Sequence, residues 1–228
     1  MYHNVQSLNA HYEDITAFPC MMNTHILLFS ETWTIFKDKF PQDDFNHYHL
    51  ISHASKRKPN DVSIYVKKDL QNMVDDADIF PNYDMVIHFI VVNFKTKIRL
   101  AVLYAKPGSS DDDIFDAIQP YRLQNSLADF NLDVNTTNGK EFCDTMENIY
   151  YLKLRNNPSD STTIHHTTID CIFSTNIVRT CGIYESAFSS HLTLYVQIPW
   201  EKMQVRTPIP SEDNNPMLEC GPDLLDRN

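Results

Sequence analysis

Carboxylate, amide and imidazole side chains stand beside several short apolar runs of this 228-residue sequence. Glu31 comes just after the apolar run 26–29, Asp129 is followed two positions later by Asn131, and His191 stands just before the last apolar stretch. Carboxylate oxygens bind divalent cations, and an imidazole transfers protons near neutral pH. These residue types indicate metal-assisted hydrolysis of a phosphate ester, which needs a cation, a positioned water and a proton donor.

The apolar runs predict the strands that would position these side chains. Short runs of apolar and β-branched residues are typical of buried strands. We expect strands at 26–29, 62–66, 86–94, 97–104, 168–173 and 192–198. The third and fourth are close enough to form a hairpin. The candidate residues would then lie where strands end, which is where layered α/β folds keep their active sites.

Three helices are expected between these strands. An apolar stripe predicts a helix at 8–18, and a second stripe of Phe142, Met146 and Ile149 predicts one at 140–150. Ser110 precedes three consecutive aspartates, and its hydroxyl can cap the free amides at the start of a further helix. The alternation of strands and helices indicates one α/β domain over residues 1–200 with mixed sheets. Residues 201–228 are rich in proline and acidic residues, and we expect a disordered tail there.

Composition restricts the class of protein. A formal net charge of −11 argues against a protein that coats nucleic acid, because that binding depends on many lysines and arginines. Lys56, Arg57 and Lys58 form the best candidate for a patch that faces phosphate, although a solvated loop would have the same composition. Neither a membrane span nor a signal peptide is visible. We therefore expect an intracellular protein, in the nucleus rather than the cytoplasm, with no membrane partner and with its five cysteines reduced.

Six short motifs occur in the order found in the endonuclease/exonuclease/phosphatase superfamily. They are NVQSL at 4–8, SETW at 30–33, LYAKP at 103–107, ADFN at 128–131, TIDCIFS at 168–174 and SH at 190–191. Each motif alone is weak, but six in the right order are a specific signal. The chain most resembles the endonuclease domains of transposable elements, those of LINE-type retrotransposons and of Helitron-type helicases.

This resemblance implies a four-layer α/β sandwich, in which two mixed β-sheets pack face to face and are flanked by helices. It also implies a DNA-nicking endonuclease that depends on Mg²⁺, or on Mn²⁺ in its place. DNA would be the main partner, and a transposon helicase or reverse transcriptase would accompany the domain. The alternatives are a phosphatase or phosphodiesterase acting on RNA or small phosphate esters, and a catalytically weakened remnant that acts as a binding module.

The resemblance also assigns roles to the candidate residues. Glu31 would be the principal metal ligand, steadied by Asn4. Asp129 would orient and deprotonate the attacking water. Asn131, two residues further on and on the same face of an extended segment, would hold the phosphate or the nucleophile. His191 would donate a proton to phosphate, Asp170 would orient that imidazole, and Tyr104 would supply one more donor. Ser190 would join the basic patch in binding substrate.

Three features depart from the pattern of the superfamily. Ser190 stands where an aspartate usually assists the metal, so cation binding should be weaker. Ala128 replaces the glycine of the Gly-Asp-Phe-Asn signature. The chain begins only three residues before Asn4, so the first strand should be short and prone to fraying. These departures are the reason for expecting weakened activity.

Overall fold

The computed structural model describes residues 1–33, 48–52, 62–80, 86–121, 125–175 and 178–199. Its strands form two six-stranded mixed sheets. The first sheet has the order β11 (Thr180–Tyr184), β12 (Thr193–Gln197), β1 (Tyr2–Asn4), β2 (Ile26–Ser30), β4 (Ser63–Lys67) and β3 (Tyr48–Ser52). The second has the order β5 (Val74–Phe80), β6 (Ile87–Phe94), β7 (Arg99–Ala105), β8 (Asn125–Asp129), β10 (Asp170–Ser174) and β9 (Lys153–Leu154).

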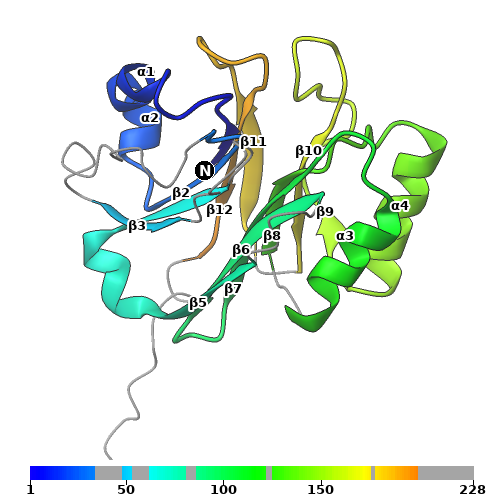
Figure 1. Cartoon of the computed structure of the whole chain (residues 1–228), viewed down its shortest axis with the longest axis horizontal. Helices are drawn as coiled ribbons and strands as arrows, with labels where there is room; N and C mark the ends of the chain where they lie inside the picture. Colours follow the sequence, from blue (N-terminus) through cyan, green and yellow to red (C-terminus); the bar gives the residue numbers. More distant parts are fainter. Residues whose placement is uncertain (34–47, 53–61, 81–85, 122–124, 176–177, 200–228) are drawn as a thin grey trace, which may run out of the picture.

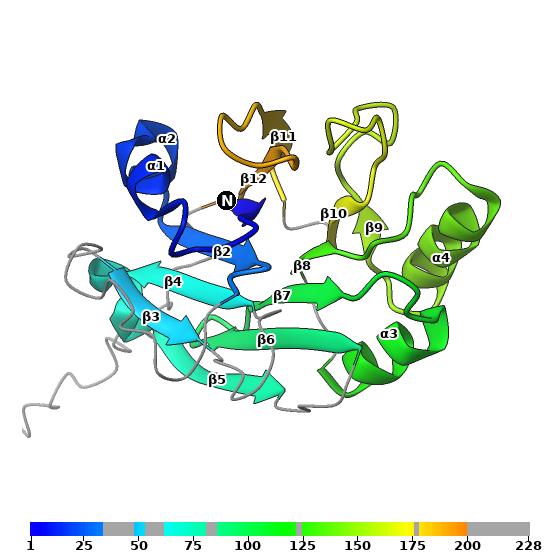
Figure 2. The ribbon, with the colours of Figure 1, turned by 45° about the horizontal axis from the view of Figure 1, so that its top comes forward.

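Helices lie outside both sheets (Figures 1 and 2). The first sheet is covered by α1 (Tyr12–Ala17) and α2 (Pro19–Met22), and the second by α3 (Asp111–Ile118) and α4 (Thr137–Asn148). Short 3₁₀ segments are present at η1 (Lys68–Met73) and η2 (Gln119–Tyr121). The result is the four-layer α/β sandwich expected from the sequence. Among the described residues, no helix is long and apolar enough to cross a membrane.

Alternating side chains place the central strands β2 and β7 between two apolar cores. In β2, Leu27 and Phe29 pack toward the first helical layer, whereas Leu28 joins the core between the sheets. In β7, Leu103 packs toward the second helical layer and Tyr104 faces the other sheet. Neighbouring strand residues point to opposite faces, so both strands are apolar on both faces. This arrangement aims Tyr104 at the ends of the strands in the opposite sheet.

The first strand is short, as expected, but it is paired on both sides. Tyr2 aligns with Leu194 of β12 and with Leu28 of β2, and β1 is fully buried at all three positions. The hairpin of β6 and β7 is also confirmed, since Ile90 pairs with Val102 across it. A strand in the interior of a sheet has no free edge to fray.

Two of the expected helices differ from the prediction at their ends. The helix expected at 8–18 begins only at Tyr12, because the preceding residues form a turn in which Gln6 and Ser7 have positive φ angles of 46° and 101°. The helix expected at 140–150 ends at Asn148, so Ile149 is not part of its buried stripe and is 64% exposed. The predicted start at Ser110 is confirmed, because Ser110 and Asp113 form a reciprocal capping box.

Candidate active site

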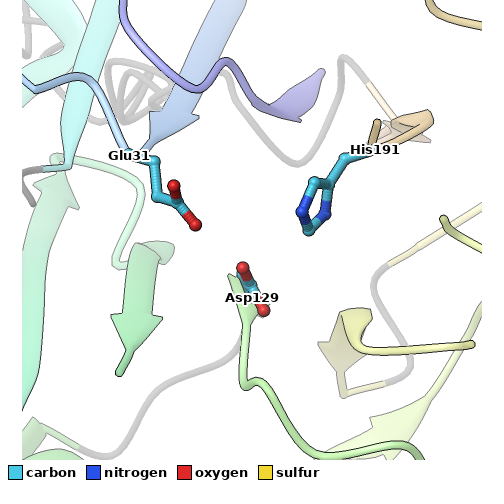
Figure 3. A group of neighbouring side chains, drawn as sticks. All are labelled: Glu31, Asp129 and His191. Atoms are coloured by element: carbon cyan, nitrogen blue, oxygen red, sulfur yellow. The ribbon is translucent and has the colours of Figure 1, made fainter. Parts of the chain in front are cut away.

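Three side chains from distant parts of the sequence converge where strands of both sheets end (Figure 3). Glu31 directly follows β2, Asp129 is the last residue of β8, and His191 precedes β12. One ligand atom from each of the three lies within 4.8 Å of the other two. The sandwich therefore brings together residues that lie far apart in the sequence.

Glu31 stands at a turn that is held by backbone hydrogen bonds. Its φ angle is 48°, a left-handed conformation that is unfavourable for a residue with a side chain. The carbonyl oxygen of Glu31 accepts a hydrogen bond from Ser7 N at 2.9 Å, and that of Ser30 accepts one from Val5 N at 3.1 Å. These bonds fix the turn, so the half-buried carboxylate points at the end of the opposite sheet.

Asn4 links the carboxylates of the two sheets. Its side chain is fully buried, and its Nδ2 donates to Oε1 of Glu31 and to Oδ2 of Asp129, both at 2.9 Å. Its Oδ1 accepts from the backbone amide of Gln6 at 3.2 Å. An amide carries two N–H donors, so one side chain satisfies both acids.

Asp129 is fully buried and bonded at both carboxylate oxygens. Asn131 N donates to Oδ1 at 2.9 Å, and Asn4 Nδ2 donates to the other oxygen. Burial raises the pKa of Asp129 well above its ordinary value, and the negative charge of Asp170 raises it further. A nearby cation would favour the ionised form, because it stabilises the carboxylate charge.

The expected placement of Asn131 is wrong in one respect. Asn131 was expected on an extended segment that shares a face with Asp129, but its φ angle is 48°, so the chain turns there. Its Nδ2 donates to the carbonyl oxygen of Ala105 at 2.7 Å. The hydrogen bond from its backbone amide to Asp129 stabilises this turn. Asn131 therefore joins the end of β8 to the end of β7.

His191 is paired with Asp170 from the opposite sheet. His191 Nδ1 lies 2.7 Å from Oδ2 of Asp170, and Asp170 is fully buried. Burial lowers the pKa of His191, but the hydrogen bond to Asp170 and the charges of Asp170, Asp129 and Glu31 outweigh it and raise the pKa to about 9. The imidazole is therefore charged at neutral pH, with Nδ1–H directed to the aspartate.

Asp170 and Tyr104 receive support that further defines the site. Tyr2 donates its hydroxyl to Oδ1 of Asp170 at 3.3 Å. Tyr104 is buried, and burial together with the charges of Glu31 and Asp129 raises the pKa of its phenol. A neutral phenol at this position is a hydrogen-bond donor. Tyr104 and Asp170 are also the strand partners of Asp129 on either side.

The donor set suits a hard divalent cation. Magnesium binds one or two carboxylates and keeps several waters for exchange with substrate oxygens. Glu31 and Asp129 supply two carboxylates that a single Asn4 amide holds close together. His191 suits a metal less, because a protonated imidazole has no lone pair to offer. Glu31 would therefore be the principal ligand of the ion, with Asp129 beside it, and His191 would remain a proton donor.

The remaining predicted site residues are those expected to bind substrate. Lys56, Arg57 and Lys58 lie outside the described residues. Ser190 is half-buried, and its Oγ donates to Oε1 of Gln6 at 3.0 Å.

Sequence reasoning missed Tyr2, Gln6 and Ser189, whose contacts support this site. Gln6 and Ser189 lie inside or beside the motifs at 4–8 and 190–191, and that proximity was the available signal. Tyr2 had none, because its contact with Asp170 joins residues 168 positions apart.

Solved structures of nucleases resemble this chain over most of its length. The endonuclease domain of TRAS1, a telomere-specific non-LTR retrotransposon, aligns with a TM-score of 0.62 and 15% identity over 86% of this chain and 96% of that one. An AP endonuclease from Archaeoglobus fulgidus aligns with a TM-score of 0.61 and 16% identity, over 86% of this chain and 97% of that one. A 3′-5′ exonuclease from Neisseria meningitidis aligns with a TM-score of 0.61 and 14% identity, over 87% of this chain and 98% of that one. No family model and no curated protein matches the sequence.

These similarities define the class of fold. The chain has the endonuclease/exonuclease/phosphatase-type fold, as the six ordered motifs predicted. Within that fold it resembles the endonuclease domain of a transposable element.

Proposed function

We propose that this protein is a metal-dependent phosphodiester hydrolase that nicks DNA. The observation that carries the proposal is the convergence of Glu31, Asp129 and His191 at one point, with ligand atoms within 4.8 Å of one another. The fold is shared with nucleases of several kinds. A half-buried and a fully buried carboxylate beside a charged imidazole provide a cation ligand, a base and a proton donor, which hydrolysis of a phosphate diester uses.

Each residue has a part that its contacts support. Asp129, a buried carboxylate whose pKa is raised by burial, would accept the proton of the attacking water. His191 would donate from Nε2 to a phosphate oxygen, since Nδ1 is held by Asp170. Tyr104 would add a second donor near Glu31. Asn131 would keep the base in place through its backbone amide.

The cation would be Mg²⁺, with Mn²⁺ as a substitute, and Glu31 would be its principal ligand. When bound, it would neutralise the negative charge of the phosphate. Asn4 would keep both carboxylates oriented whether or not the ion is present, because it is bonded to both.

The substrate class is proposed from the fold and the similar structures. The retrotransposon domain and the AP endonuclease are both named as endonucleases, and they cover nearly the whole chain. We infer that DNA is the partner and that the domain originates from a transposable element. A helicase or reverse transcriptase of that element would then deliver the domain to its target, and the three basic residues at 56–58 would contact the phosphate backbone.

Nicking of supercoiled plasmid tests the proposal. Relaxed circles should form with Mg²⁺ or Mn²⁺ and not with excess EDTA, and a DNA polymerase should extend the nick if it carries a 3′ hydroxyl. Glu31→Ala protein, prepared in parallel, is the control. No activity above that control at any metal concentration would reject the proposal.

A phosphatase is the second candidate. A solved structure that aligns with a TM-score of 0.58 and 13% identity over 87% of this chain is named as a 3′ phosphatase bound to a DNA hairpin product. Release of inorganic phosphate from a 3′-phosphorylated oligonucleotide faster than nicking of the same duplex would favour this function. The same donor set would serve, because both reactions transfer a phosphoryl centre to water.

A further inference from the structure

Three serines connect the loop before β12 to the segment that begins with β1. Ser186 Oγ lies 3.1 Å from Nε2 of His3, Ser189 Oγ donates to the carbonyl oxygen of Asn4 at 2.8 Å, and Ser190 Oγ donates to Gln6 at 3.0 Å. We call Ser186, Ser189 and Ser190 the serine latch. Each of these bonds joins residues more than 180 positions apart, so the latch holds two distant parts of the chain together.

Ser189 has the central position in the latch. Its Oγ accepts a hydrogen bond from the backbone amide of His191 at 3.1 Å while donating to the carbonyl of Asn4. A hydroxyl has one proton to donate and two lone pairs to accept with, so both bonds can exist at once. The half-buried side chain of Ser189 therefore connects the backbone of His191, which carries the charged imidazole, to the backbone of Asn4. The side chain of Asn4 in turn holds both carboxylates.

Gln6 strengthens the same connection. Its Oε1 accepts from Oγ of Ser190 at 3.0 Å and from the backbone amide of Ser190 at 3.3 Å. Its own backbone amide donates to Oδ1 of Asn4 at 3.2 Å. Because Gln6 has a positive φ of 46°, the chain turns sharply after Asn4 and brings this amide back to the site.

Two further contacts hold His191. Asp170 fixes the ring through Nδ1, and a bridge to Thr163 pairs the backbone of His191 with the loop on its far side. The first of these reaches β1 only indirectly, through the hydroxyl of Tyr2 that is bonded to Asp170. Ser189 connects the backbone of His191 to the backbone of Asn4 directly.

We propose that Ser189 is a positioning residue that sets the distance between the imidazole of His191 and the carboxylates held by Asn4. This inference rests on the proposed function, because that function gives the distance its importance. A displacement of about 1 Å in a reacting group can cost about 100-fold in rate. Loss of the Ser189 hydroxyl should therefore slow the chemical step and leave substrate binding nearly unchanged.

Steady-state kinetics of Ser189→Ala, Ser189→Thr and Ser159→Ala test the inference. Ser159 is exposed and serves as the control for removal of a serine hydroxyl. We expect Ser189→Ala to lower kcat about tenfold with KM within about twofold of the wild-type value, which corresponds to about 1.4 kcal/mol in the barrier. Threonine keeps the hydroxyl, so Ser189→Thr should recover most of the rate.

A second readout does not need catalysis. NMR spectra of the imidazole of His191 should shift in Ser189→Ala and stay unchanged in Ser159→Ala. If the alanine variant fails to fold, Ser189→Cys replaces it, because a thiol fills the space while bonding weakly. Wild-type kcat together with unmoved His191 signals in a folded variant would overturn the inference. If the wild type hydrolyses no phosphate ester, the proposed function fails, and the NMR comparison alone still decides whether Ser189 positions His191.

Discussion

Nδ2 of Asn4 lies 2.9 Å from Oδ2 of Asp129, although the two residues belong to different sheets. The same nitrogen donates to Glu31 at the same distance. Two carboxylates would repel each other if both were ionised, and a shared amide reduces that cost in the absence of a cation. The candidate site is therefore organised by the fold before any metal binds.

Replacement of Glu31 by glutamine should weaken metal binding without unfolding the site. Glutamine keeps an oxygen for Asn4, but it removes the negative charge that attracts a cation. We expect Mg²⁺ affinity, measured by isothermal titration calorimetry, to fall at least about tenfold, which is about 1.4 kcal/mol. Glu147→Gln is a matched control, because Glu147 is exposed and pairs only with Lys153 among its described contacts. Equal affinity in the two variants would remove Glu31 from the metal site.

Asp170→Asn should leave the position of His191 intact and change its proton affinity. The hydrogen bond and charge of Asp170 raise the pKa of His191 to about 9 against the opposing effect of burial. Without that charge the pKa should fall, although Asp129 and Glu31 still raise it, so less of the imidazole would be protonated at pH 7. NMR titration measures the pKa directly, and kcat should drop about 100-fold or more. An unchanged titration curve would show that another group keeps His191 charged.

Ser190→Asp should strengthen binding of the cation. It adds a carboxylate beside His191, and the amide of Gln6 can rotate to donate to it in place of accepting from the serine. We expect the metal concentration at half-maximal activity to decrease several-fold relative to wild type, with Ser190→Ala showing no such decrease. If the aspartate variant needs as much metal as the alanine variant, position 190 has no effect on the ion.

His3 should make stability sensitive to acid. Burial lowers the pKa of His3 from 6.5 to about 3, and the neighbouring charge of His191 lowers it further, against a raising contribution from the backbone of Leu192. Below pH 6.5 His3 binds a proton in the unfolded chain but stays neutral in the folded chain. The free energy of unfolding therefore falls as the pH decreases from 6.5 toward 3. Urea unfolding across this range should show a steeper loss for wild type than for His3→Gln. Parallel pH dependences would contradict the low pKa.

Much of the central fold could be predicted because central strands are apolar on both faces. For this reason the sequence predicts the strand at 26–29 and the hairpin of β6 and β7. It does not predict the edge strands β5 and β11. Asp75, Asp76 and Asp78 make β5 polar along much of its length, which an edge strand tolerates because one side faces solvent. A sequence pattern of this kind does not distinguish such a strand from a loop.

The site was predictable in membership and less so in geometry. The order of motifs selected Glu31, Asp129, Asp170 and His191, and the structure brings all four together. The contacts between the two sheets could not be predicted from the sequence. The hydrogen bond between Tyr2 and Asp170, for example, depends on how the whole sandwich packs. The left-handed turn at Asn131 is a local choice that asparagine tolerates but does not require.

Hydrolysis of plasmid DNA by wild type, Asp129→Asn and His191→Ala, purified identically and checked for folding, tests the central claim most directly. The wild type should nick with Mg²⁺ present, and each variant should be slower by about 100-fold or more, because each lacks one proton-transfer group. Nicking at the wild-type rate by both folded variants would contradict the account, since the chemistry would then occur somewhere other than the point where Glu31, Asp129 and His191 meet.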